Sequence, residues 1–349
     1  MKTYNIYNFV RVDVDDSYSW NDTLFLAQGM AEEGTNIPCE GKILIRQVEK
    51  FDFSTLRFIG DDCYVGTNVY FDKKYGVCLQ KISDNELHLI AEQECNEWLI
   101  IALELLLLQQ KRTLLHAAAV ENGGDALVMP SWGGVGKTAI VCKFVKEHGW
   151  KLLGDDLVII DQNNVHAFLK PFVIYPYHKN LFPDVFSSNP NHIVKNLALS
   201  NLMSKAIPTV KRALRPFPFL LAFLRKHNPQ SMRVSPLKIF SEHSFAKSAV
   251  PKKVVWLDRT TASDLQLNNI SVNELTSRAA TITSVELFSD KLCNFYHLCG
   301  CGIFNYDETI GRIHEIITDF CQTSDIQLFQ IPTSVSINDI GEVAYKHLH

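Results

Sequence analysis

The first 93 residues consist of short segments in which hydrophobic and polar positions alternate. β-Branched and aromatic residues are frequent in these segments, and Gly, Asn and Asp separate them, as is typical of strands joined by turns. Six segments are expected to be strands: residues 5–14, 41–48, 55–60, 63–72, 75–82 and 86–92. The pattern predicts a small β-rich module over residues 1–93.

The pattern changes at residue 94 to a nearly continuous apolar run. Residues 94–112 are rich in leucine and long enough for a helix, and they include the most apolar stretch of the chain, residues 98–108. That stretch contains Glu104 and is much shorter than the roughly 20 residues that cross a bilayer. We therefore expect a buried helix and no membrane-spanning segment.

A strand, loop, helix and strand come next. Residues 113–130 are expected to form two strands around the turn Asn122-Gly123-Gly124, residues 137–148 a helix that Gly149 ends, and residues 150–160 one strand. Further strands are expected at residues 165–170, 172–177, 254–258 and 326–333, and helices at 271–280, 310–321 and from Asn338 onward. This alternation predicts an α/β domain over residues 94–349.

Composition limits the environment and the partners. The 349 residues carry a formal net charge of −4 and are 46% hydrophobic, which favours a globular protein without general affinity for nucleic acid. Nine scattered cysteines without a Cys-x-x-Cys pair fit a reducing compartment, and the N-terminus lacks the apolar core of a signal peptide. We expect a cytoplasmic protein. The segment HLCGCG, residues 297–302, has no second cluster at ligand spacing and is not expected to bind zinc.

Residues 205–253 depart from the average charge, with eleven Lys or Arg residues and one acidic residue, Glu242. The pattern predicts a basic, partly helical insertion at about residues 200–253. Three interpretations stay open: a solvated basic surface, a lid or substrate-binding subdomain whose cations stabilise transferred phosphate, and a surface for nucleic acid or an anionic membrane.

The stretch VMPSWGGVGKTAIVCKF, residues 128–144, is close to the glycine-rich loop that binds nucleotide phosphates. Glycines let successive backbone N–H groups approach one anion, and the helix that begins near Lys137 adds its positive dipole end. Lys137 supplies an ammonium for the β- and γ-phosphates, and Thr138 supplies a hydroxyl for Mg²⁺. Ser131 replaces the first glycine of the usual pattern. The alternative to a nucleotide site is a glycine-rich turn without a ligand.

An acidic pair, Asp155 and Asp156, follows the loop helix at the start of a hydrophobic strand. Because neighbouring side chains of a strand point to opposite faces, we expect different roles, one at Mg²⁺ and one taking the proton of an acceptor hydroxyl. The alternative is a turn before a core strand. His116, one strand before the loop, is either a functional or a hydrogen-bonded structural residue.

Together, residues 116–160 resemble the catalytic core of the HPr kinase/phosphorylase family, whose P-loop fold is like that of phosphoenolpyruvate carboxykinase. In that family a histidine-containing strand precedes the loop, the loop ends in S-G-x-G-K-[ST], and an Asp-Asp pair follows the next helix. This chain matches at residues 134–138, with Gly133 in place of the serine. The resemblance predicts a P-loop domain of this type behind the β-rich module.

The resemblance implies a kinase that uses ATP or GTP with Mg²⁺ and phosphorylates a hydroxyl group of a peptide, a protein or a small molecule. It implies Asp155 as general base, Asp156 as its partner on the metal side, and His116 beside the transferred phosphoryl group. The nucleotide and the metal would be bound by the loop, namely by Gly133, Gly134, Val135, Gly136, Lys137 and Thr138.

Some features fall outside the resemblance. The chain has no counterpart of the EIRGLG segment or of the C-terminal recognition region of true HPr kinases, so HPr is not the expected substrate. Arg259, just past the strand 254–258, is a candidate for nucleotide contact or for a structural role. A P-loop ATPase or nucleotide switch without an acceptor and a catalytically degenerate scaffold remain as alternative functions, and homo-oligomer formation stays open.

Overall fold

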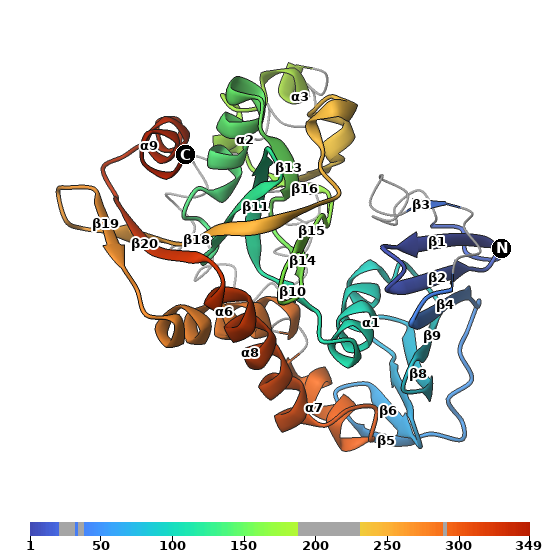
Figure 1. The fold of residues 1–349 in the computed structure, drawn as a ribbon. Coiled ribbons are helices and arrows are strands. Elements are labelled where there is room, and N and C mark those ends of the chain that lie inside the picture. Colours follow the sequence, from blue (N-terminus) through green and yellow to red (C-terminus); the bar gives the residue numbers. More distant parts are fainter. Residues whose placement is uncertain (21–31, 34–37, 188–230, 289–291) are drawn as a thin grey trace, which may run out of the picture. The chain divides into compact units, whose positions relative to one another are not determined.

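A computed structural model describes residues 1–20, 32–33, 38–187, 231–288 and 292–349. These residues form a mixed α/β protein with two large mixed β-sheets and several helices (Figure 1). The chain divides into two compact units, residues 1–170 together with 242–349, and residues 171–241. The predicted basic insertion overlaps the second unit, and its residues 200–230 lie outside the described part of the chain.

The strands of residues 1–93 form one sheet, in the order β3-β1-β2-β4-β9-β8-β7-β6-β5. The strands are β1 (Lys2–Ile6), β2 (Val10–Val14), β3 (Glu32–Glu33), β4 (Gly41–Gln47), β5 (Arg57–Gly60), β6 (Cys63–Gly66), β7 (Val69–Asp72), β8 (Val77–Ser83) and β9 (Glu86–Ala91). β4 is parallel to both of its neighbours, and the other pairs are antiparallel. All six segments that the alternation predicts as strands lie in this sheet.

Two of the predicted segments are hairpins and not single strands. Residues 5–14 turn at Tyr7 and Asn8, which have φ of 52° and 63°, and residues 63–72 turn near Asn68, which has φ of 59°. Asparagine tolerates this left-handed conformation better than most residues. Across the first turn, Asn5 Nδ2 donates to Asn8 Oδ1 and the backbone N–H of Asn8 donates to Asn5 Oδ1. The asparagines were the sequence signal for these turns.

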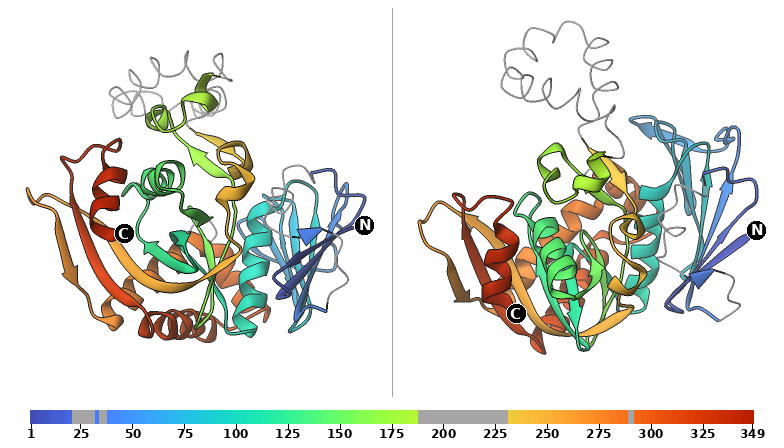
Figure 2. Two further views of the ribbon diagram at one scale, coloured as in Figure 1. Left: turned by 45° about the horizontal axis from the view of Figure 1, so that its top comes forward. Right: turned by 90° about the horizontal axis from the view of Figure 1, so that it is seen from above.

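Helix α1 (Asn96–Gln109) is buried along almost its whole length, as its apolar sequence predicts. It contacts β2, β4, β8 and β9 of the first sheet and β10 (Thr113–Leu115) of the second. Figure 2 shows this helix between the two sheets in both views. Within the described residues, no helix is both long and apolar enough to cross a membrane.

Glu104 is a fully buried carboxyl group on α1. The Thr113 hydroxyl donates to its Oε1 at 2.6 Å and the Leu114 N–H to its Oε2 at 2.8 Å, yet burial outweighs these bonds and raises its pKa from 4.5 to about 7. Between pH 4.5 and pH 7 the Glu104 carboxyl keeps its proton in the folded protein but loses it in the unfolded chain. The free energy of unfolding therefore falls as the pH rises through this range.

Glu104→Gln is expected to remove this pH-dependent cost. Glutamine is neutral and can still accept from the Leu114 N–H, so the variant should gain about 3 kcal/mol relative to the parent on going from pH 4.5 to pH 8. Urea unfolding of both proteins at the two pH values measures the difference. An identical pH dependence of the two proteins would contradict an unfavourable buried charge at Glu104.

The second sheet has the order β10-β14-β15-β18-β12-β11-β13, with β20 beside β18 and β19 beside β20. Its strands after β10 are β11 (Ala117–Asn122), β12 (Asp125–Pro130), β13 (Lys151–Gly154), β14 (Val158–Ile160), β15 (Val165–His166), β18 (Ser248–Thr260), β19 (Gln266–Asn269) and β20 (Asp325–Pro332). β12 and β20 are both parallel to β18. The predicted turn at residues 122–124 is confirmed as the connection of β11 to β12.

The helices of this domain are α2 (Lys137–His148), α6 (Val272–Phe288), α7 (Leu292–Gly300), α8 (Tyr306–Gln322) and α9 (Ile340–Leu348). α2 packs on β11 and β13 and against α9, whereas α6 and α8 pack on each other and on β10 (Figure 1). α6 and α8 are longer than predicted, and α9 begins after Asp339 and not at an Asn338 cap. Gly341 allows the α2–α9 contact, because a Cβ there would lie 2.9 Å from Ala139 O.

The smaller unit contains a two-stranded sheet of β16 (Phe172–Ile174) and β17 (Met232–Val234), and helix α3 (Pro183–Ser187). Short 3₁₀ turns occupy Pro176–His178 and Pro236–Lys238 in this unit, and Glu242–Ser244 in the larger one. The predicted strand at residues 172–177 therefore ends at Ile174, before a proline that cannot donate to a sheet.

Candidate functional site

The glycine-rich segment connects β12 to α2 and has an open face. Gly134 and Gly136 have φ of 81° and 110°, a conformation that favours glycine. A Cβ on Gly133 or Gly134 would meet nothing within 4 Å, so the outer side of the loop is open. The N-cap of α2 is Gly136, which has no capping side chain, and the N–H groups of the first turn can therefore serve an anion.

Lys137 points back into this loop and is buried. Its Nζ lies 2.8 Å from Ser131 O, 3.2 Å from Trp132 O and 3.0 Å from His116 Nε2. Burial lowers the pKa of this ammonium group. Ser131 is thus accommodated at the position of the missing glycine. Its backbone carbonyl holds Lys137, and its fully buried Oγ has no hydrogen-bond partner in the described residues.

His116 is buried between β10 and β11, and its backbone N–H donates to Thr283 Oγ1 on α6 at 3.0 Å. Since an ammonium group can only donate, Nε2 accepts the bond from Lys137 and the ring proton lies on Nδ1. Burial, and then the charge of Lys137, lower the pKa of His116 to about 4, so the ring is neutral. Nδ1 lies 3.6 Å from Asp156 Oδ1 and has no hydrogen-bond partner in the described structure.

The acidic pair lies in a turn between β13 and β14. The sequence predicted one continuous strand over residues 150–160, and this prediction is wrong. The chain bends tightly here and Gly154 permits the bend, because a Cβ at this position would lie 2.4 Å from Leu157 O. β13 and β14 pair with different neighbours in the sheet. The alternation of strand faces therefore does not apply to Asp155 and Asp156, although the two carboxylates do have different partners.

Asp155 faces the loop helix and Asp156 faces the histidine. Asp155 Oδ2 accepts a hydrogen bond from Thr138 Oγ1 at 2.9 Å, and its buried Oδ1 has no partner in the described residues. Asp156 Oδ2 accepts from Lys170 Nζ at 2.5 Å, on the side opposite to the contact of Oδ1 with His116.

The two carboxyl groups differ in protonation as well. Burial, and secondarily the charge of Asp156, raise the pKa of Asp155 to about 7. For Asp156, burial acts in the same direction but is outweighed by Lys170 and His116, which hold its pKa at about 2. Asp156 is therefore ionised at neutral pH. The Asp155 carboxyl is partly protonated at neutral pH, and a nearby cation would favour loss of its proton.

The residues around Thr138 fit Mg²⁺. Mg²⁺ is usually held by one or two carboxylates together with substrate phosphates and water, not by a cage of protein ligands. Thr138 Oγ1 and the unpartnered Oδ1 of Asp155 supply such oxygens beside the open loop. Among the described residues, no group of three or more His, Cys, Asp or Glu side chains could hold a metal ion. The described cysteines Cys299 and Cys301 belong to no such group.

Arg259, a predicted candidate for nucleotide contact, has structural contacts. It lies in β18, and its guanidinium donates to Thr333 O at 3.3 Å and to Val335 O at 2.8 Å. These bonds fix the chain that leaves β20 towards α9. Its buried Nη1 has no partner in the described residues.

Two residues of the site carry no sequence signal. Lys170 follows β15 and Thr283 lies within α6, far from the loop in sequence. A lone lysine at the end of a strand and a threonine inside a helix are common, so neither indicates a site. Only the fold brings Lys170 to Asp156 and Thr283 to His116.

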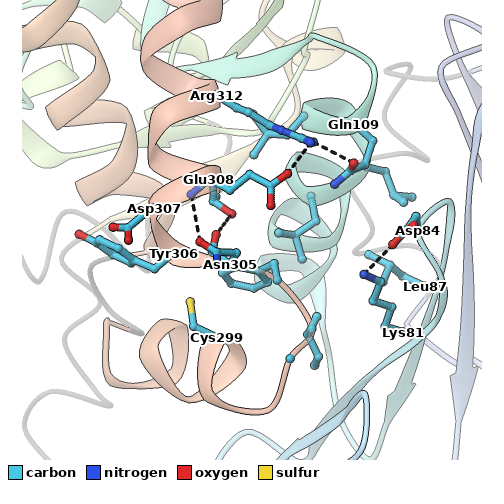
Figure 3. A pocket seen from close by; sticks show the side chains of 17 residues that line it. Lys81, Asp84, Leu87, Gln109, Cys299, Asn305, Tyr306, Asp307, Glu308 and Arg312 are labelled. Carbon is cyan, nitrogen blue, oxygen red and sulfur yellow. Dashed lines mark hydrogen bonds and ion pairs between the residues drawn. The ribbon is translucent and has the colours of Figure 1, made fainter.

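A separate cavity of about 700 Å³ lies between the β8–β9 hairpin, α1 and the first turn of α8 (Figure 3). Two ion pairs line it, Lys81 with Asp84 and Arg312 with Glu308. Burial raises the pKa of the Cys299 thiol in its wall to about 11, so this group is protonated at neutral pH and is a poor nucleophile. This cavity contains no loop residue and offers no activated nucleophile among its described lining residues.

Comparisons with known proteins give no family assignment. No protein-family model matches this chain, and a search of curated proteins finds no significant match. The resemblance to HPr kinase/phosphorylase therefore rests on the sequence of residues 116–160 alone.

Proposed function

We propose that this protein is a Mg²⁺-dependent kinase that transfers the γ-phosphoryl group of ATP or GTP to an acceptor hydroxyl, with a P-loop domain of the HPr kinase/phosphorylase type. The observation that carries the proposal is the convergence on Lys137 of the loop carbonyls and His116, with the Thr138–Asp155 pair alongside. A ligand-free turn would have no need for a buried ammonium, whose desolvation is unfavourable.

The residues divide the work as follows. The open N–H groups of the loop and Lys137 bind the β- and γ-phosphates, and Lys137 stabilises the charge of the transition state. Thr138 and Asp155 would hold Mg²⁺, which supplies charge neutralisation at the phosphates when it is bound. Asp156, ionised and beside His116, orients the acceptor hydroxyl and takes its proton.

The resemblance implies Asp155 as the base and Asp156 near the metal. The division proposed here exchanges these two roles. The contacts favour the exchange, because Thr138 is the residue expected at Mg²⁺ and Asp155 is its hydrogen-bond partner. A carboxylate of low pKa suffices as the proton acceptor, since phosphoryl transfer passes through a loose transition state with little demand for a strong base.

Two asparagine variants distinguish these roles. Asp155→Asn is expected to raise the Mg²⁺ concentration needed for half-maximal rate at least tenfold, because one charged ligand is lost. Asp156→Asn is expected to lower kcat by a factor of about 10² to 10⁴ with little change in that Mg²⁺ concentration. Steady-state rates over a Mg²⁺ titration measure both effects. The opposite pattern would restore Asp155 as base.

The function itself is tested by phosphoryl transfer from γ-labelled Mg·ATP into a cell extract that is separated by size. Label in an acceptor with the parent protein, and none with Lys137→Met, is the expected result. Label released only as inorganic phosphate would favour an ATPase or nucleotide switch. A degenerate scaffold predicts no stabilisation by Mg·ATP, whereas a ligand at 100 times its dissociation constant stabilises by about 2.7 kcal/mol.

A further inference from the structure

The residues proposed to act on the γ-phosphoryl group lie on one side of the glycine-rich loop. His116 precedes β11, and Asp156 follows β13. In the sheet, β11 and β13 follow β12 on one side, whereas β18 and β20 follow it on the other. Since His116 contacts Lys137 Nζ and Asp156 contacts His116, the γ-phosphoryl end of a nucleotide belongs on the β11–β13 side. The nucleoside at the other end of the phosphate chain is then expected towards β18 and β20.

The carboxyl ends of β18 and β20 reach the edge of the sheet from which the loop departs. β12 pairs with β18 as far as Val128 and Val254, whereas β18 and β20 run on side by side to Thr260 and Pro332. The three strands are parallel, and in α/β sheets ligands bind outside the carboxyl ends of such strands. Residues 333–339, which connect β20 to α9, therefore lie at the ligand-binding edge. We call them the C-terminal segment.

The C-terminal segment borders the start of α2. A Cβ on Gly136 would lie 2.6 Å from Ile340 Cδ1 and 3.4 Å from Ile337 Cδ1, so both isoleucine side chains lie against the loop. Ile340 is fully buried, whereas Ile337 is only partly buried. Ile337 thus presents apolar surface beside the first N–H groups of α2, where a phosphate chain would leave the loop. Apolar surface suits a base and a ribose and gives nothing to a phosphate.

The C-terminal segment is held in place by hydrogen bonds of its own and by Arg259. The Arg259 guanidinium donates to Thr333 O at 3.3 Å and to Val335 O at 2.8 Å. Ser336 Oγ donates to Asp339 Oδ2 at 2.6 Å, and the Asp339 N–H donates to Ser336 O at 3.1 Å. A segment that is fixed before a ligand arrives loses little conformational entropy when the ligand binds.

We propose that the C-terminal segment binds the nucleoside, with Ile337 against the base and the ribose and with Arg259 as a positioning residue that holds the segment. This inference rests on the nucleotide binding that the proposed function requires, and it assigns the part of the nucleotide that the loop does not bind. The contact with Ile337 is the same before and during phosphoryl transfer. Its loss should therefore raise KM for ATP and leave kcat unchanged.

The test compares a nucleotide with a phosphate chain that has no nucleoside. Dissociation constants of Mg·ATP and Mg·tripolyphosphate are measured by isothermal titration calorimetry on the full chain. Ile337→Ser is expected to raise the constant for Mg·ATP by a factor of about 5 or more, and to leave that for tripolyphosphate within about twofold. Ile337→Val keeps the apolar contact and should bind Mg·ATP like the parent protein. Equal changes for both ligands, or no change for Mg·ATP, would overturn the inference.

Two further variants separate a nucleoside site from a general effect on the fold. Ile82→Ser changes an exposed isoleucine on β8 of the other sheet and should leave both constants at their parental values. Arg259→Gln should weaken Mg·ATP and spare tripolyphosphate, as Ile337→Ser does. A lower stability of Arg259→Gln in urea with an unchanged ratio of the two constants would mean that Arg259 supports the fold but does not position the nucleoside site.

The two proposals fail in different ways. If the parent protein binds neither Mg·ATP nor tripolyphosphate, the kinase function fails and the nucleoside site fails with it. If the parent binds both with equal affinity and Ile337→Ser changes neither, the loop binds phosphates and only the nucleoside site is overturned. If Mg·ATP binding depends on Ile337 but no phosphate reaches an acceptor, the nucleoside site stands and the kinase function fails.

Discussion

Lys137→Met is expected to lower the rate of phosphoryl transfer about 10³-fold while the protein stays folded. The variant loses the ammonium that would contact the phosphates, and loss of one such donor in a catalytic site typically costs a factor of 10² to 10³. The free energy of unfolding should change by no more than about 1 kcal/mol, because the unfavourable burial of the charge offsets its hydrogen bonds to Ser131, Trp132 and His116. Steady-state kinetics and urea unfolding measure the two quantities.

Lys143→Met is the matched control on the same helix. Lys143 Nζ forms ion pairs with Glu147 at 2.6 Å and Glu342 at 2.7 Å, near the surface and away from the loop. Exposed pairs of this kind contribute little, so stability should fall by less than about 1 kcal/mol and the rate should not change. If Lys137→Met were fully active, the ammonium would be structural and the kinase proposal would lose its main support.

The elements that the sequence predicts well depend on local patterns. α1 has an apolar sequence on all sides, which requires burial wherever the helix lies, and the Asn122-Gly123-Gly124 turn fixes the β11–β12 hairpin through its own backbone preferences. The glycine-rich loop is likewise predicted from a local sequence pattern. Its glycines, Lys137 and Thr138 are neighbours in sequence, and their relative placement follows from the start of one helix.

The errors concern features that distant contacts decide. Residues 150–160 are hydrophobic enough for one strand, but β13 pairs with β11 and β14 pairs with β10 and β15, which forces a break at the acidic pair. The contacts of Lys170 and Thr283 with the site likewise arise only after the sheet and α6 have packed. The roles that we propose for Asp155 and Asp156 rest on their contacts with Thr138, Lys170 and His116, and the order of the two residues in sequence does not reveal these contacts.

Gly154→Ala is expected to destabilise the protein by about 3 kcal/mol and to abolish activity. A Cβ at this position would lie 2.4 Å from Leu157 O and 2.8 Å from Val158 Cγ1. The first contact is with backbone, so a change of side-chain rotamer cannot relieve it, and overpacking of this kind costs from about 1 to 3 kcal/mol or more. The turn would have to open, and this movement would separate Asp155 from Thr138. Urea unfolding and the transfer rate measure the two effects.

Gly311→Ala gives the opposite expectation for the same chemical change. Gly311 lies inside α8, where a Cβ would meet nothing within 4 Å, and alanine should stabilise this helix by about 0.5–1 kcal/mol without affecting the rate. Val158→Ala added to Gly154→Ala removes the side-chain clash but not the backbone one, so it should not restore stability. Full stability of Gly154→Ala would mean that the turn holding the two aspartates differs from the one described, and the division of their roles would lose its structural basis.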